Sequence, residues 1–200
     1  VVSNPAANGS FVVGGVTTAA AQGNKATADF SGLGALTINR DPATGVVRVN
    51  PSNANNVADK YSVLTLAPVS SITANVLAVG DSSQNSGSAG QVNQLILGNT
   101  SNALNANTIN VGTGGRDVGS VTFPSAAGTV TVRAADGTSR AALNVGTGTA
   151  NTAALWVNCP QDGTRRRELY TSGTGKATGC GYHRPSAAAQ GAITNAGITL

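Results

Sequence analysis

The sequence has little of what ordinary soluble domains are built from. It has no methionine, aromatic residues make up 4% of its 200 positions, and charged residues make up 10%. Ordinary domains carry about 25% charged residues, so this chain is far from a typical cytoplasmic domain. Because large side chains are scarce, a single conventional core would be thin. The sequence favours many small cores, as in a stack of narrow coils that cover one another.

The shortage of charge does not indicate disorder. Disordered chains combine low hydrophobicity with high net charge, whereas 40% of these residues are hydrophobic and many are β-branched, which favours strands. The 26 glycines lower helix propensity, and no long stretch has a helical period. The sequence therefore predicts an all-β fold.

Two further absences concern location and partners. No run of about twenty apolar residues is present, so no transmembrane helix is predicted. The chain starts at Val1 without a signal peptide or any methionine, which predicts a processed or excised product whose targeting segment has been removed. The formal net charge is +4, and the basic residues are spread thinly except in one late segment, so the charge indicates solubility rather than a nucleic-acid partner.

A short strand that ends in glycine recurs along the chain. Its pattern is apolar, any residue, apolar, Gly, so that alternate side chains share one face and the glycine turns a corner. The instances are Phe11-Val12-Val13-Gly14, Leu77-Ala78-Val79-Gly80, Leu95-Ile96-Leu97-Gly98, Ile109-Asn110-Val111-Gly112 and Leu143-Asn144-Val145-Gly146.

The spacing of these units predicts a solenoid. Gly112 follows Gly80 by 32 residues and precedes Gly146 by 34, which is the period of stacked repeats. Val79, Val111 and Val145 are therefore expected to lie directly above one another. A second strand set in the same phase is predicted at Leu64–Leu66, Leu95–Leu97 and Val130–Val132, with Val121–Phe123 as a third strand in the last full period.

The chain divides into three parts. Residues 1–155 form the predicted repeat region, which is clearest at 60–155, and residues 30–50 are an earlier part of it, with strands at 36–38 and 46–49 around a turn at 41–45. Residues 156–185 break the pattern and are predicted to be an insertion or end cap. Residues 186–200 are a terminal strand segment.

The repeat region resembles a known family. The segments LILGNTSNALNANTINVGTGGRD, GTVTVRAADGTSR and AALNVGTGTANT, between Leu95 and Asn151, resemble the autotransporter-associated β-strand repeat proteins of bacterial surfaces. The resemblance implies a right-handed parallel β-helix that is secreted or displayed at the cell surface, without shared catalytic residues. The alternative fold is an antiparallel β-sandwich fibre subunit completed by a partner's strand.

Cys159 and Cys180 are the only cysteines and lie 21 residues apart. A disulfide that closes the cap is the favoured interpretation. A metal site that adds His183 is the alternative, but paired CxxC or HxxxH spacing is missing, so no metal and no cofactor is predicted. A thiol nucleophile with His183 as its base lacks a visible third partner.

One basic cluster stands out, and it contains Arg165, Arg166, Arg167, Lys176 and Arg184. It is interpreted as a solvated loop or as a contact for an acidic glycan or another subunit. The second interpretation leads to an alternative function, a carbohydrate-binding module that uses residues 159–184.

The acidic residues do not form an evident catalytic pair. Asp81, Asp117 and Asp136 fall in predicted turns and are isolated, which favours turn roles over calcium binding. The chain is therefore predicted not to be an enzyme. A β-helix polysaccharide lyase or hydrolase stays as an alternative, because carboxylates on successive coils can converge in space.

These observations predict a structural protein of the cell surface or extracellular space. Asn105, Asn107, Asn110 and Asn144 are expected to hydrogen-bond along the stack. The solenoid would act as a fibre, stalk or adhesion module that self-associates into homo-oligomers or filaments. Strand edges or the terminal strands near 10–15 and 191–200 would make the contact.

Overall fold

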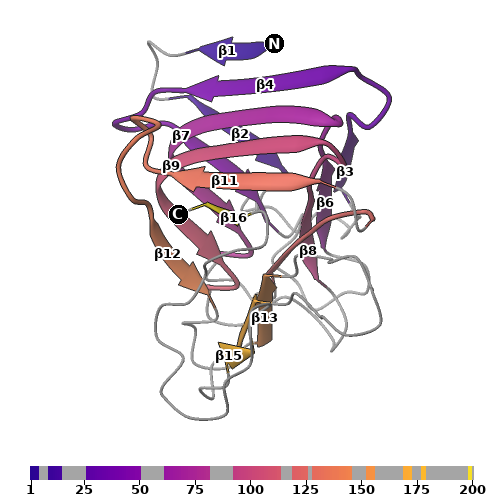
Figure 1. Cartoon of the computed structure of the whole chain (residues 1–200), viewed down its shortest axis with the longest axis vertical. Coiled ribbons are helices and arrows are strands. Elements are labelled where there is room, and N and C mark those ends of the chain that lie inside the picture. The colour runs from indigo at the N-terminus through magenta and orange to yellow at the C-terminus, as the bar shows by residue number, and fades with distance from the viewer. Residues whose placement is uncertain are drawn as a thin grey trace, which may run out of the picture.

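The computed structural model describes residues 1–4, 9–14, 26–50, 61–81, 92–113, 119–125 and 128–145, together with the backbone of four further strands between 152 and 199. Every regular element in this part of the chain is a β-strand. The strands lie on three faces, and Figure 1 shows those of the first face one below another.

The first face is a parallel sheet, in which strands of successive coils pair from β1 to β11 and β16 pairs with β11 at the end. The second face continues the same sheet around a corner, because the long strands β7 and β9 take part in both faces. In order, the first face contains β1 (Val2–Asn4), β4 (Ala35–Arg40), the first part of β7 (Val69–Val79), the first part of β9 (Ser101–Val111), β11 (Thr129–Arg133) and β16 (Ile198–Thr199). The second face contains β2 (Ser10–Val13), β5 (Val46–Val49), the later parts of β7 and β9, and β12 (Ala142–Val145).

The third face is a separate sheet. Its parallel strands are β3 (Ala26–Asp29), β6 (Ser62–Thr65), β8 (Asn93–Ile96), β10 (Gly119–Thr122) and β13 (Thr152–Leu155). It ends in two antiparallel additions, β14 (Leu169–Ser172) and β15 (Ala177–Thr178).

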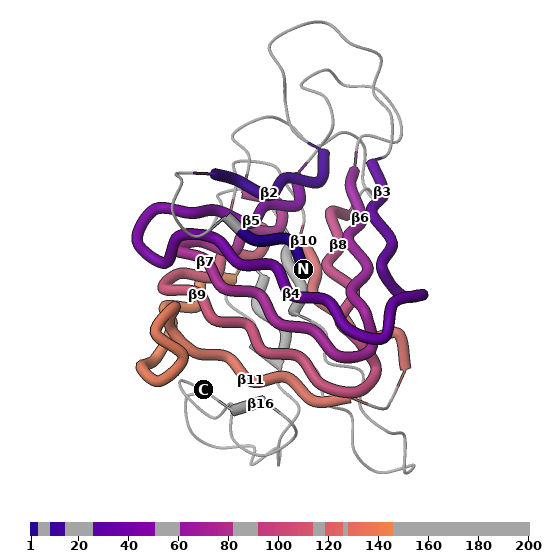
Figure 2. Tube along the Cα trace, turned by 90° about the horizontal axis from the view of Figure 1, so that it is seen from above, coloured from indigo at the N-terminus to yellow at the C-terminus, as the bar shows by residue number. Residues whose placement is uncertain are grey.

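The chain visits these faces in a fixed order, which makes the fold a parallel β-solenoid. After β3 it returns to the third face at β6, β8 and β10, and so completes about three turns. Figure 2 looks down this winding, with β4, β7 and β9 crossing beneath one another and β3, β6 and β8 on the opposite side. The alternative of an antiparallel β-sandwich is wrong, because the strands of successive coils pair in parallel on all three faces, and only β14 and β15 are antiparallel additions.

The predicted valine column is confirmed. Val79 pairs in register with Val111, and Val111 pairs with Val145. The column extends toward the N-terminus through Val49 and Val13. Each coil therefore places a valine at the equivalent position of the second face, and these valines form an apolar ladder along it.

Glycines follow the valines of this column for a conformational reason at three positions. Gly14 has a φ of 75°, Gly80 a φ of 72° and Gly112 a φ of 60°, a region that disfavours side chains. Gly98 lies at a different corner, and a Cβ there would collide with the carbonyl oxygen of Ala67 and lie 2.6 Å from that of Pro68. Close approach of the neighbouring coil is the reason for this glycine. Gly146 lies outside the described residues.

The predicted second strand set needs a correction. Leu64 pairs with Leu95 as expected, but Val121 completes this column on the third face. Val130–Val132 belongs to the first face, where β11 pairs with β9. The prediction was wrong there because apolar alternation is the same on every face, so it does not reveal which face a strand joins. The earlier strands predicted at 36–38 and 46–49 are confirmed, since β4 and β5 pair with the two parts of β7.

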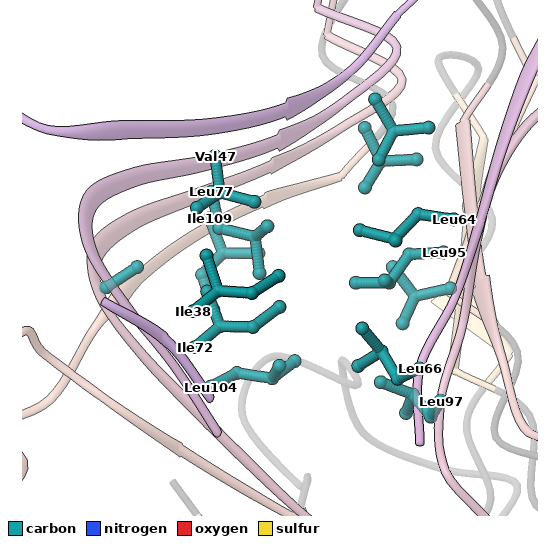
Figure 3. Close-up of a cluster of buried hydrophobic side chains, with 14 of the residues drawn as sticks. Ile38, Val47, Leu64, Leu66, Ile72, Leu77, Leu95, Leu97, Leu104 and Ile109 are labelled. Carbon is teal, nitrogen blue, oxygen red and sulfur yellow. The ribbon is translucent and has the colours of Figure 1, made fainter. Parts of the chain in front are cut away.

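The core is a continuous column of aliphatic side chains between the faces. In Figure 3, Ile38, Ile72 and Leu104 of the first face point toward the leucines of the third face. The largest side chains that are less than 2% exposed are Ile38, Leu64, Leu66, Ile72, Leu77, Leu95, Leu97, Ile109, Val47, Val49 and Val79. Full burial of one such side chain stabilises the fold by roughly 1.5–3 kcal/mol. Many thin layers thus replace one large aromatic core.

Candidate functional site

The residues predicted to form a disulfide or a basic contact lie outside the described residues. These are Cys159, Cys180, Arg165, Arg166, Arg167, Lys176 and Arg184, and the same is true of His183 and Asp117. The disulfide and the basic contact therefore stay predictions.

A polar cluster, here called the Arg48–Asp81 clamp, lies where β5 and β7 end. Arg48 Nε and Nη2 donate to the two carboxylate oxygens of Asp81, at 2.9 and 3.1 Å. Asn50 Nδ2 donates to Asp81 Oδ1 at 2.9 Å, and the Asp81 backbone N–H donates back to Asn50 Oδ1 at 3.2 Å. This two-point arginine contact is the strong, geometrically specific form of an ion pair.

The clamp joins two successive coils. The Asp81 side chain is 12% exposed and that of Arg48 is 37% exposed, so the pair is partly shielded from solvent. Its carboxylate already accepts three hydrogen bonds from side chains of the first coil. The arrangement fixes the chain where it leaves the second face rather than offering an open carboxylate to a ligand.

Sequence reasoning identified Asp81 as a turn residue but missed Arg48. The available signal was the separation of 33 residues between them, which is close to the repeat spacing. In a solenoid, residues one period apart are spatial neighbours. Oppositely charged residues separated by one period are therefore candidates for pairing.

Three exposed carboxylates serve their own turns. Asp136 Oδ1 accepts from the backbone N–H groups of Thr138 and Ser139, at 2.7 and 2.8 Å, and its Oδ2 accepts from the Ser139 hydroxyl at 2.6 Å. These bonds, led by the Ser139 hydroxyl, hold the pKa of Asp136 well below its usual range. Asp41 and Asp29 have lowered pKa values for the same kind of reason, with the backbone N–H of Ala43 and the side chain of Ser31 as the first causes.

Through the clamp and these turns, each carboxylate among the described residues accepts hydrogen bonds from the chain itself. No group of three or more His, Cys, Asp or Glu residues that could hold a metal ion occurs among the described residues. The arrangement favours turn and clamp roles for Asp29, Asp41, Asp81 and Asp136.

Asparagine side chains link the coils at the corner between the first and second faces. Asn107 Nδ2 donates to Asn75 Oδ1 at 3.0 Å and to the carbonyl oxygen of Pro42 at 2.9 Å. Asn107 Oδ1 accepts from the backbone N–H of Ala135 at 3.1 Å. One side chain thus contacts three other coils, which we call the Asn107 corner.

The expected asparagine ladder is present at some of the predicted positions. Asn144 Nδ2 donates to Asn110 Oδ1 at 2.9 Å across the second face. Asn105 instead faces Thr73 and Arg133 in register, so it does not stand opposite another asparagine.

A buried asparagine that sequence reasoning missed holds another corner. Asn102 is 4% exposed. It donates to the carbonyl oxygens of Gly98 and Thr129, at 2.8 and 3.0 Å, and accepts from the Gly98 backbone N–H at 2.8 Å. Its side chain replaces the backbone partners that the corner lacks.

The outer surface of the first face is open. Its outward positions carry small, mostly uncharged side chains, none of which is buried. They are Ala35, Thr37, Asn39, Val69, Ser71, Thr73, Ser101, Ala103, Asn105, Thr129, Thr131 and Arg133. The other two faces are mixed, because Ala78 and Ser120 are 0% and 4% exposed whereas Val12 is 43% exposed.

Comparison with known proteins gives no match to any protein-family model, curated protein or solved structure. Over the residues that the structure describes, no helix has the length and apolar character needed to cross a membrane. The fold and the polar contacts are thus the basis for a functional proposal.

Proposed function

We propose that this chain is a non-enzymatic structural module of the extracellular space or cell surface, which acts as a fibre, stalk or adhesion spacer. The observation that carries the proposal is the parallel stacking of successive coils on a continuous aliphatic core. Such a body transmits its geometry from one coil to the next, and its length grows with the number of coils. The described polar clusters bind other coils of the chain, which supports a mechanical role.

Among the described strands, those at the N-terminal end of the stack have a neighbour on one side only. They are β1, β2 and β3, which pair with β4, β5 and β6. An exposed strand edge accepts a further strand through backbone hydrogen bonds. We infer that a second copy adds its own strands at this end, so that oligomers or filaments grow along the stack.

Two exposed valines allow a direct test of edge-mediated assembly. Val12 on the edge strand β2 and Val69 on the central strand β7 have the same exposed fraction, 43%. Val12→Lys places a charge at the edge, and Val69→Lys places the same charge away from it. We expect light scattering and electron microscopy to show that wild-type assemblies grow with concentration, that Val12→Lys reduces them and that Val69→Lys does not. A wild type that is monomeric at every concentration would contradict the proposal, and equal loss in both variants would contradict the edge as the contact.

Export and handedness follow from the resemblance to autotransporter-associated β-strand repeat proteins. A right-handed winding is supported by the strong preference of parallel crossover connections for that hand, about 98% of cases.

An oxidising compartment supports a Cys159–Cys180 disulfide that closes the cap. Alkylation of both cysteines in the unfolded, non-reduced protein would contradict the disulfide.

Carbohydrate binding is the second candidate, and the basic cluster between Arg165 and Arg184 favours it. Guanidinium groups form two-point contacts with carboxylates and phosphates of acidic glycans. We expect binding on a glycan array to fall when Arg165, Arg166 and Arg167 are all replaced by Ala. Binding that persists in this triple variant would remove the reason for placing the contact there.

A further inference from the structure

We draw no further inference here: the strongest candidate, the open outer face of β4, β7, β9 and β11 (Figure 1), is a stripe of small side chains, and nothing in the structure shows what covers it.

Discussion

The corner between the first and second faces is crossed in two different ways. In the two middle coils, β7 and β9 pass through it without interruption, with Asn75 and Asn107 at the bend. In the coils on either side, a turn at 41–45 or 134–141 separates the strand of the first face from the strand of the second face. We call these two turns the looped corners. All four coils nevertheless keep the same strand register on both faces. The comparison shows that strand pairing on the two faces determines the register, whereas the number of residues in the corner between them can vary.

The largest effect on the free energy of unfolding is expected from truncating a buried side chain between the faces. Ile72 is fully buried in β7 between the coils above and below it. Ile72→Ala should lower the free energy of unfolding by about 2–5 kcal/mol, because it leaves a cavity in a thin layer. The neighbouring Thr73 points outward, so Thr73→Ala should change stability by less than about 0.5 kcal/mol. Urea denaturation measures both, and equal effects would show that the aliphatic column does not hold the walls.

Two glycines allow the stability cost of a close approach between coils to be compared with that of strain in a looped corner. Gly98→Ala forces a Cβ against the backbone of the preceding coil and should destabilise the fold by about 1–3 kcal/mol, as overpacking does. Gly137, in the turn at 134–141, has a φ of 74° and open space around it, so Gly137→Ala should cost about 1 kcal/mol through backbone strain alone. Thermal unfolding of the two variants tests this order. A larger loss for Gly137→Ala would mean that the looped corner constrains the fold more than the close approach does.

The Asn107 corner should respond more weakly. Asn107→Ala removes two donated bonds and one accepted bond. Because the side chain is exposed, the expected loss is about 1–2 kcal/mol for all three bonds together. Asn105→Ala, on the same strand but opposite Thr73 and Arg133, is the matched control and should have almost no effect. Equal urea midpoints for the two variants would rule out a stabilising role for this corner.

The smallest effect concerns the carboxylates of the two looped corners. The folded-state pKa values of Asp41 and Asp136 are depressed, so their bonds stabilise the fold above the unfolded-state pKa of about 3.9. That contribution is lost as the pH falls below about 4. Asp136→Asn cannot titrate, and we expect its melting temperature to decline less than that of the wild type between pH 6 and pH 2.5. Parallel profiles for the two proteins would contradict the turn role of this carboxylate.

The sequence predicted the parts of the fold that repeat with a recognisable marker. Glycine after an alternating apolar triplet identified the valine column, and the turn at 41–45 identified β4 and β5. The face assignment of Val130–Val132 was not predictable, because apolar triplets on different faces are equivalent in pattern. Asn102 was not identified from the sequence, because burial of an asparagine depends on backbone groups that come together only in the folded corner.

The Arg48–Asp81 clamp has a consequence for how the protein would respond to force. The pair spans 33 residues of chain, so it fastens one complete coil without a covalent bond. Pulling on the ends would have to break this fastening before the coil between them could unwind. Release of these 33 residues would lengthen the chain by about 110 Å at full extension. A stalk made of such coils would therefore absorb tension in discrete increments.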